Sequence, residues 1–329
     1  MKLLLFNCLM LFYFTAIARE QSSVVLAQNF LGKMNDAAQK LRYSGVFVFQ
    51  KNDHIVTSRI THDVKNGVEL EKLEVLDGRP REYIRRDDHV TSYQPDSKLM
   101  RSEMRQAKDM FPSMLAVEGI DLSESYLFRL ANRGRVAGVD CQIILVEPKD
   151  HLRFGYRFCA ALPSGLMLQA QVHNAKHYIL EQVAFTHLVI GTIDHRALTP
   201  TYLTRREWKV VSENEAVRSV SGWQVNGLPA GFKKIREVKQ IINAPSAVVP
   251  IAGVSDLRPA VQLVFSDGLA AVSVFVERLN QQHHYVGILQ RGATTVFGCQ
   301  HGDFWITVVG EVPLAAIKLF AKSVEFKPK

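Results

Sequence analysis

Turn signals set the architecture of this chain. Between residues 43 and 187, runs rich in Val, Ile, Phe and Tyr alternate with short polar pairs that favour tight turns. Asn66-Gly67 and Asp77-Gly78 are the strongest of these signals, because a type I′ hairpin turn needs a positive φ at both central residues. The pattern predicts a long antiparallel meander rather than alternating strands and helices. The strands that we expect lie at 43–50, 55–61, 69–76, 82–86, 89–93, 126–130, 142–147, 153–158, 166–172 and 178–187.

One helix is expected before these strands. Residues 22–41 carry apolar residues at helical spacing, and Ser22 or Ser23 is available as the N-cap. A sheet this large must curl and needs something against its inner face, so we expect the helix to fill that space. The apolar face that we expect consists of Leu26, Phe30, Met34, Ala38 and Leu41.

A second structural unit is expected after a polar connector. Residues 199–221 are mostly polar and charged, which is typical of a linker with an extended piece in it. Residues 243–260 are expected to form a long loop, and Pro313 marks the start of a helix. The predicted divisions are 1–18 (signal peptide), 19–198 (N-terminal domain), 199–221 (linker) and 222–329 (small α+β domain), the last with strands at 232–242, 261–265, 270–277, 294–299 and 304–309.

The first eighteen residues have the order of a secretory signal peptide. Lys2 supplies the positive end, residues 3–14 form an apolar core too short to favour a membrane-spanning helix, and Ala16-Ile17-Ala18 fits the cleavage rule. We therefore expect an exported, soluble mature chain. Its formal net charge of +8 suits anionic lipid headgroups, lipopolysaccharide phosphates or acidic peptides, or else a solvated basic surface. Nucleic acid is not an expected partner outside the cytoplasm.

Two cysteines flank a predicted hairpin. If the chain turns near Asp150, Cys141 and Cys159 lie directly opposite each other on two antiparallel strands. In an oxidising compartment they would form a structural disulfide worth about 3 kcal/mol. Alternatively they are two small apolar strand residues, and the sequence leaves both interpretations open. Neither a metal site nor a redox pair is expected, because further ligands at zinc spacing and a CxxC motif are absent.

Signatures of catalysis are absent from the sequence. It contains no GxSxG, HExxH, Walker A or GxGxxG motif. Ser266, in the stretch FSDG, is better explained by a hairpin turn than by a nucleophile. The pair His283-His284 and the stretch Cys299-Gln300-His301 each lack a third metal ligand at useful spacing. We therefore expect no enzyme activity, no metal and no cofactor.

Two segments favour binding. The methionine-rich stretch 100–115 suits flexible apolar ligands such as acyl chains, or else forms a short helix packed on the sheet. In the arginine-rich stretch 78–88, Arg81 and Arg85 share one face of a strand and suit phosphate or carboxylate groups, or else a solvated face. The candidate lipid contacts here are Met100, Met104, Met110, Phe111, Met114 and Leu115, and the candidate anion ligands are Arg79, Arg81, Arg85 and Arg86.

Several segments resemble a known family. They are YSGVFVFQ, LDGRPREYIRRDDHVTSYQPDSK, VAGVDCQIILVEPKDHLRFGYR, FSDGLAAVSVFVE and GDFWITVVGEVP, and they look like the periplasmic sigma-E factor regulatory proteins, the RseB/MucB family. The likeness spans nearly the whole mature chain, in order. It implies an N-terminal LolA-like domain, a curved antiparallel half-barrel around a helix, followed by a small C-terminal α+β domain. The apolar cleft of such a domain adds Phe47 and Phe49 to the candidate lipid contacts.

The resemblance also implies a function. Members of this family bind the periplasmic domain of a membrane anti-sigma factor and shield it from site-1 proteolysis. Lipopolysaccharide or mislocalised lipoprotein is expected to release them, and a homodimer is a further expectation. The resemblance thus predicts a periplasmic negative regulator of the envelope stress response. The alternative is a periplasmic lipid or lipoprotein carrier of LolA type, which would take lipid from a membrane donor and need no anti-sigma partner.

Overall fold

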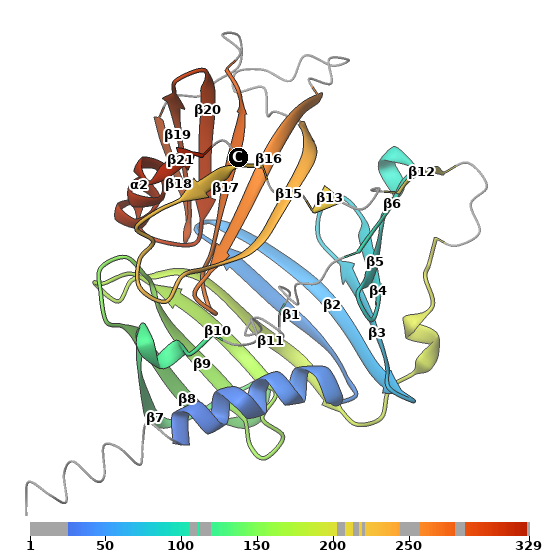
Figure 1. Cartoon of the computed structure of the whole chain (residues 1–329). Coiled ribbons are helices and arrows are strands. Elements are labelled where there is room, and N and C mark those ends of the chain that lie inside the picture. The colour runs from blue at the N-terminus through green and yellow to red at the C-terminus, as the bar shows by residue number, and fades with distance from the viewer. Residues whose placement is uncertain are drawn as a thin grey trace, which may run out of the picture.

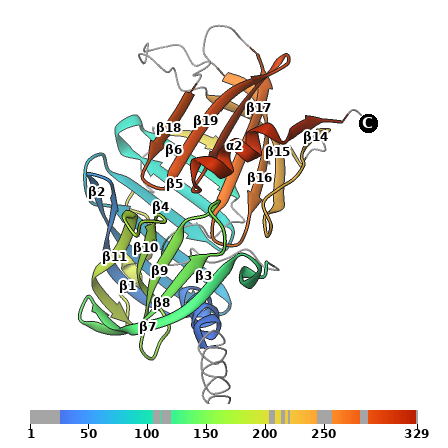
Figure 2. The same cartoon turned by 90° about the vertical axis from the view of Figure 1, so that its left-hand side faces the viewer.

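Two antiparallel sheets form most of the molecule, one above the other in Figure 1 and in the turned view of Figure 2. The computed structural model describes residues 26–104, 111, 120–202, 208–212, 217–218, 221–243, 257–279 and 287–327. The predicted signal peptide lies outside these residues. The larger sheet comes from the N-terminal part of the chain and the smaller one from the C-terminal part.

The larger sheet consists of two meanders that lie side by side. It has twelve strands in the described chain, and its first strand pairs with the last strand of the second meander. The strands are β1 (Tyr43–Lys51), β2 (His54–Lys65), β3 (Val68–Val75), β4 (Arg81–Arg86), β5 (His89–Gln94), β6 (Leu99–Met104), β7 (Tyr126–Val136), β8 (Val139–Pro148), β9 (Gly155–Ala161), β10 (Met167–His173), β11 (Ile179–Ile190) and β12 (Lys209–Ser212). In the described sheet only β12, which pairs with β6, runs parallel to its neighbour. Three short 3₁₀ helices occur in the connections: η1 (Pro95–Ser97), η2 (Leu122–Glu124) and η3 (His195–Leu198).

The predicted hairpin turns lie where the sequence places them. Asn66 and Gly67 have φ values of 54° and 79°, so both central residues are left-handed, as a type I′ turn requires. At Asp77-Gly78 only the glycine has a positive φ, of 69°, and the Asp77 carboxylate accepts the backbone N–H of Thr57 at 2.5 Å. The position of this second turn was predicted, but its type was wrong.

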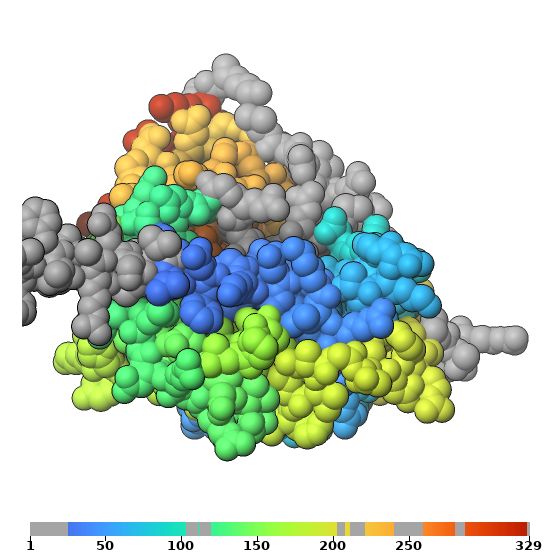
Figure 3. Space-filling view, turned by 90° about the horizontal axis from the view of Figure 1, so that it is seen from below, coloured from blue at the N-terminus to red at the C-terminus, as the bar shows by residue number. Residues whose placement is uncertain are grey.

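The N-terminal helix lies across the larger sheet, and the space-filling view of Figure 3 shows it as a blue band along the green second meander. Residues 26–40 are helical. The predicted apolar face was wrong at its start, because Leu26 is 49% exposed. Steps of four residues turn about 40° beyond a full circle each time, so a strict i+4 row drifts off one face. The buried residues alternate steps of four and three instead: Ala27, Leu31, Met34 and Ala38, with Ala37 beside them.

The smaller sheet carries the second helix. In Figure 2 this helix, α2, lies against the sheet, and its buried residues Ile317 and Phe320 belong to a core separate from that of the first sheet. The order of the seven strands in the described chain is β13-β15-β16-β17-β20-β19-β18. The elements are β13 (Val217–Arg218), β14 (Trp223–Val225), β15 (Lys233–Asn243), β16 (Leu257–Ser266), β17 (Ala271–Arg278), β18 (Gly287–Arg291), β19 (Thr294–His301), β20 (Phe304–Gly310), α2 (Leu314–Lys322) and β21 (Val324–Phe326), of which β14 and β21 pair with each other.

The predicted loop at 243–260 was wrong at its end. Residues 257–260 already belong to β16, where Pro259 faces Ile241 of β15. The pairing of β16 with β17 begins only at Ala260, so Pro259 lies where one side of the strand is unpaired. A proline is tolerated at such a position because its missing N–H leaves no ladder bond unmade. Residues 244–256 lie outside the described chain.

The start of the predicted linker, 199–221, is bound to the first sheet. The Lys72 ammonium donates to the carbonyl of Thr199 at 3.0 Å and to the hydroxyl of Thr201 at 2.9 Å. The Glu82 carboxylate accepts the backbone N–H of Thr201 at 3.0 Å. Further on, β12 extends the first sheet and β13 extends the second. The connector is therefore tied to both sheets rather than crossing between them without contacts.

Candidate functional site: the inner face of the half-barrel and the domain junction

Three phenylalanines meet on the inner face of the larger sheet. Phe47 of β1 and Phe185 of β11 are partners in the strand register, with ring centroids 6.0 Å apart. Phe111 contacts both, at 5.2 Å from Phe47 and 4.9 Å from Phe185. Phe49 is half-buried and packs against the same core. The rings of Phe47, Phe111 and Phe185 thus pack into one aromatic cluster.

The methionine-rich stretch is divided between a strand and a region outside the described residues. Met100 and Met104 lie in β6, opposite Tyr93 and His89 of β5. The short helix considered for this stretch is therefore wrong at these two positions, because β6 pairs with strands on both sides. The remaining candidates of this stretch, apart from Phe111, lie outside the described residues: Met110, Met114 and Leu115.

Arg85 is held inside the sheet by acidic residues. Its Nη2 atom donates to Glu69 Oε1 at 2.6 Å and to Glu71 Oε2 at 3.1 Å. Burial opposes the charge of Arg85, but the two carboxylates outweigh burial and raise its pKa. The structure therefore already neutralises Arg85, whereas the other candidate arginines, Arg79, Arg81 and Arg86, are exposed.

A stacked aromatic pair lies next to this ion pair. The ring of Tyr43 stacks on that of His62 with centroids 4.8 Å apart, and His62 Nε2 lies 3.0 Å from Glu69 Oε1. Burial, and after it the charge of Glu71, raise the pKa of Tyr43 well above its ordinary value. Its hydroxyl has no hydrogen-bond partner among the described residues. The inner face thus combines an apolar part around Phe47 with a buried polar part.

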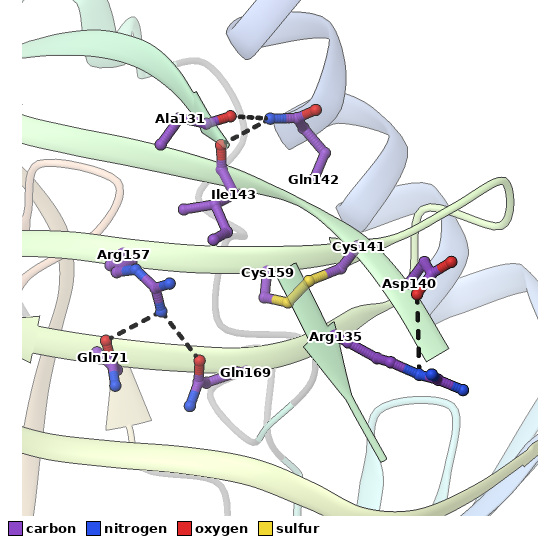
Figure 4. Close-up of a disulfide and its surroundings, with 10 residues drawn as sticks. All are labelled: Ala131, Arg135, Asp140, Cys141, Gln142, Ile143, Arg157, Cys159, Gln169 and Gln171. Atoms are coloured by element: carbon purple, nitrogen blue, oxygen red, sulfur yellow. Dashed lines mark hydrogen bonds and ion pairs between the residues drawn. A yellow bond between two sulfur atoms is a disulfide. The ribbon is translucent and has the colours of Figure 1, made fainter. Parts of the chain in front are cut away.

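Cys141 and Cys159 form a disulfide with their Cα atoms 5.5 Å apart. Figure 4 shows it beside Arg157, whose Nη1 donates to the side chains of Gln169 and Gln171. The predicted register was wrong, because Cys141 faces Ala161 and Cys159 faces Ile143. The hairpin is centred on residue 151 rather than on Asp150, so the disulfide joins diagonal neighbours. Such diagonal pairs remain within reach of each other across an antiparallel ladder.

A buried ion pair joins the two domains. Arg153, in the loop between β8 and β9, donates from Nε to Asp267 Oδ2 at 2.7 Å, and both side chains are 0% exposed. The hydroxyl of Tyr126 donates to the same oxygen at 2.9 Å. Burial first, and then Tyr156 and Asp267, raise the pKa of Tyr126, so this hydroxyl keeps its proton. The Arg153 guanidinium also pairs with the Asp150 carboxylate and donates to the carbonyl of Ala230.

Asp267 also shapes its own turn between β16 and β17. Its Oδ1 atom accepts the backbone N–H groups of Leu269 at 3.1 Å and Ala270 at 2.8 Å. A Cβ at Gly268 (φ 97°) would lie 2.6 Å from Leu122 of the first domain, so this turn fits closely against it. The hydroxyl of Ser266 donates to the Ala270 carbonyl at 2.9 Å, which confirms the turn interpretation of FSDG.

A second polar contact joins the domains at the tip of β1. Lys51 pairs with Glu181 of β11 at 2.7 Å and donates to the hydroxyl of Thr294 in the C-terminal domain at 2.6 Å. Glu181 accepts the backbone N–H of Ala293 at 2.8 Å. A Cβ at Gly292 (φ 59°) would lie 2.6 Å from Glu181 Oε1, so glycine permits this close approach.

Sequence reasoning missed both contacts of the domain junction. The Asp267-Gly268 turn signal was recognised, but its partner Arg153 lies 114 residues away. Within the described part of the chain, no group of three or more His, Cys, Asp or Glu side chains could hold a metal ion. In the same residues, no helix is both long enough and apolar enough to cross a membrane.

The fold and these contacts define a two-domain protein: a half-barrel closed by a helix and joined through buried polar groups to a small α+β domain. Family models for the MucB/RseB N-terminal and C-terminal domains match residues 26–208 and 217–325. The chain belongs to the MucB/RseB family. The predicted family and the predicted α+β fold class are both confirmed.

Similar proteins cover nearly the whole chain. The sigma-E factor regulatory protein RseB of Haemophilus influenzae is 26% identical over 308 residues, which is 92% of this chain and 91% of that protein. The sigma factor AlgU regulatory protein MucB of Pseudomonas aeruginosa is 28% identical and covers 91% of this chain and 90% of its own. A crystal structure of MucB in complex with MucA(peri) is 28% identical with a TM-score of 0.70, and covers 92% of this chain and 100% of that one. These names describe regulatory proteins, in agreement with the expectation that the chain is not an enzyme.

Proposed function

We propose that this protein is a periplasmic negative regulator of the envelope stress response. It binds the periplasmic domain of a membrane anti-sigma factor and shields that domain from site-1 proteolysis. The observation that carries this proposal is the match of both domains, in order, to MucB/RseB models at residues 26–208 and 217–325. A similar chain, MucB, has been crystallised in complex with MucA(peri), and its fold covers 92% of this one.

Lipopolysaccharide or mislocalised lipoprotein weakens this binding in the proposed function. A ligand shifts an equilibrium only by its difference in affinity for two states, so the lipid must prefer the released protein. The inner face of the half-barrel is the proposed site, because its aromatic cluster offers an apolar environment for an acyl chain. Phe111 has to move for such a chain to enter beside Phe47 and Phe185.

A protease-protection assay tests this function. The mature protein would be mixed with the anti-sigma periplasmic domain and the site-1 protease, with and without lipopolysaccharide. We expect the protein to slow cleavage roughly in proportion to the bound fraction of the domain, and lipopolysaccharide to restore cleavage. Cleavage is followed on gels over time, with the protease on an unrelated substrate as the control for direct inhibition.

The outcomes separate the proposed function from the carrier alternative. A protein that neither binds the domain nor slows its cleavage contradicts the regulator and leaves lipid transfer as the leading function. Protection that lipopolysaccharide does not change supports the regulator but contradicts release by this lipid. Equal lipid affinity of the free and the complexed protein would contradict the lipid switch itself, because a ligand without preference shifts nothing.

A further inference from the structure

Among the described residues, the smaller sheet ends in an edge strand with a neighbour on one side only. β18, Gly287–Arg291, is the terminal strand of the sheet and pairs only with β19 in the described chain. Figure 2 shows it at the rim of the C-terminal domain. The backbone groups on its outer side make no backbone hydrogen bond within the described residues. Such a row of free donors and acceptors is a template for another strand.

Two neighbouring side chains of β18 are both apolar and exposed. Ile288 is 42% exposed and Leu289 is 57% exposed. Because neighbouring strand residues point to opposite faces, apolar groups flank this edge on both sides. In natural proteins, charges, prolines or bulges usually prevent an edge strand from pairing with another chain. Within β18 a charge occurs only at its last residue, Arg291.

The terminal strand β7 of the larger sheet, unlike β18, carries features that hinder pairing with another chain. β7 is also a terminal strand, but it carries exposed Arg129, Arg133 and Arg135. Its pairing with β8 is also interrupted by an irregularity between Leu130 and Arg133. These are the devices that keep an edge from pairing with another chain. The contrast within one molecule indicates that the apolar edge of β18 is kept for a partner.

We propose that β18 binds an extended segment of the anti-sigma periplasmic domain, which adds a strand to the smaller sheet. This inference rests on the proposed function and names its contact surface. A peptide backbone fits the edge, because it presents donors and acceptors at strand spacing, and its apolar side chains cover Ile288 and Leu289. A second copy of this chain fits less well, because five paired residues bury far less than the ~1,200 Å² of a stable interface.

The position of β18 favours a partner that crosses both domains. The turn after β18 contains Gly292 and Ala293, which contact Glu181 of the half-barrel. Three more exposed apolar residues lie within four positions of Lys51 or Glu181: Ile55 (54%), Tyr178 (67%) and Ile179 (53%). These residues belong to the same end of the half-barrel, and by strand register Ile179 shares the face of Lys51 and Glu181 whereas Ile55 lies on the opposite face. An extended segment on β18 that runs past this turn reaches the half-barrel beside Glu181.

A matched pair of substitutions tests the inference. Leu289→Lys places a charge on the proposed docking edge, and Leu127→Lys places the same charge on the terminal strand β7, where Leu127 is equally exposed (55%). We expect Leu289→Lys to weaken binding of the anti-sigma periplasmic domain roughly tenfold or more, and Leu127→Lys to change it less than about twofold. Binding is measured by calorimetry, and thermal unfolding confirms that both variants fold.

Hydrogen exchange supplies a second readout on the unmodified protein. We expect the amides of residues 287–291 to exchange more slowly once the partner is bound, whereas those of β7 keep their rates. If the unmodified protein does not bind the domain, both the proposed function and this inference are contradicted. If it binds, but Leu289→Lys binds equally well and residues 287–291 stay unprotected, the inference alone is overturned. A Leu289→Lys change that instead abolishes a homodimer would assign β18 to self-association and overturn it too.

Discussion

Replacing Asp267 by alanine is expected to lower the free energy of unfolding by about 3–5 kcal/mol, the largest effect that we expect from a single side chain. The change removes the Asp267 carboxylate, 2.7 Å from the Arg153 guanidinium, which is 0% exposed and keeps only its pair with Asp150 and its bond to the Ala230 carbonyl. It also removes the acceptor of the Tyr126 hydroxyl and of two turn amides, Leu269 and Ala270. A buried charge that loses one of its two carboxylates keeps its desolvation cost with less compensation, which is why the loss exceeds that of an exposed pair.

Asp194 supplies the matched control for this change. Its carboxylate also pairs with an arginine, Arg196, at 3.0 Å, and it also accepts a backbone N–H, but it is exposed. Asp194→Ala is expected to leave the unfolding midpoint almost unchanged, since solvent screens such pairs. Denaturant unfolding followed by tryptophan fluorescence measures both variants. Equal midpoints for the two would contradict a stabilising role of the buried pair.

A double replacement separates the charge from the packing. Arg153→Met combined with Asp267→Leu removes both charges and keeps apolar volume at the junction. Buried ion pairs are often replaced in this way at little cost, so we expect the double variant to be more stable than Asp267→Ala. If it is no more stable, the turn amides and Tyr126, rather than the guanidinium, account for the loss.

The strands were predictable because their signals are local. Turn dipeptides such as Asn66-Gly67 need nothing beyond their own φ values to end a strand. The start of the helix face was harder, because steps of four and of three residues look alike in a short segment. Pro259 was misread as part of a loop, since only the pairing of the neighbouring strands shows that one side of β16 is free there.

The features of the candidate site could be predicted only where they depend on residues that are close together in the sequence. Strand parity groups Arg81 with Arg85, but it cannot show that Glu69 and Glu71 of the next strand neutralise Arg85 while Arg81 stays exposed. The same limit applies to the junction, where Arg153 and Asp267 come from different domains. Contacts between distant segments follow from the register and the docking of whole sheets, which no local pattern contains.

Removing the disulfide is the second large effect that we expect. Replacing Cys141 and Cys159 together by alanine should lower the free energy of unfolding by about 3 kcal/mol, because the bridge closes a loop across a sequence separation of 18 and restricts the unfolded chain. Both side chains are buried, so the folded state also loses packing between β8 and β9. Denaturant unfolding in the absence of reductant measures the difference.

Cys299 provides the control for that experiment. It is a free, half-buried thiol whose pKa is raised by burial, so it is mostly protonated and unreactive near neutral pH. Cys299→Ala is expected to cost well below 3 kcal/mol, roughly that of a small apolar truncation. Alkylation of a form that begins at residue 19, and so lacks Cys8, under denaturing conditions should label Cys299 alone before reduction, and Cys141 and Cys159 as well after it, as read by mass spectrometry. Labelling of all three before reduction would contradict the disulfide.

The disulfide and the domain junction are expected to depend on each other. The chain between Cys141 and Cys159 contains the loop that carries Arg153, so the bridge restrains the segment that reaches Asp267. With the bridge removed, that loop has more freedom, and part of the ion-pair energy is already lost. Asp267→Ala should then cost less in the double alanine variant than in the unmodified protein, a coupling that a double-mutant cycle measures directly. Strictly additive losses would show that the two features stabilise the fold independently.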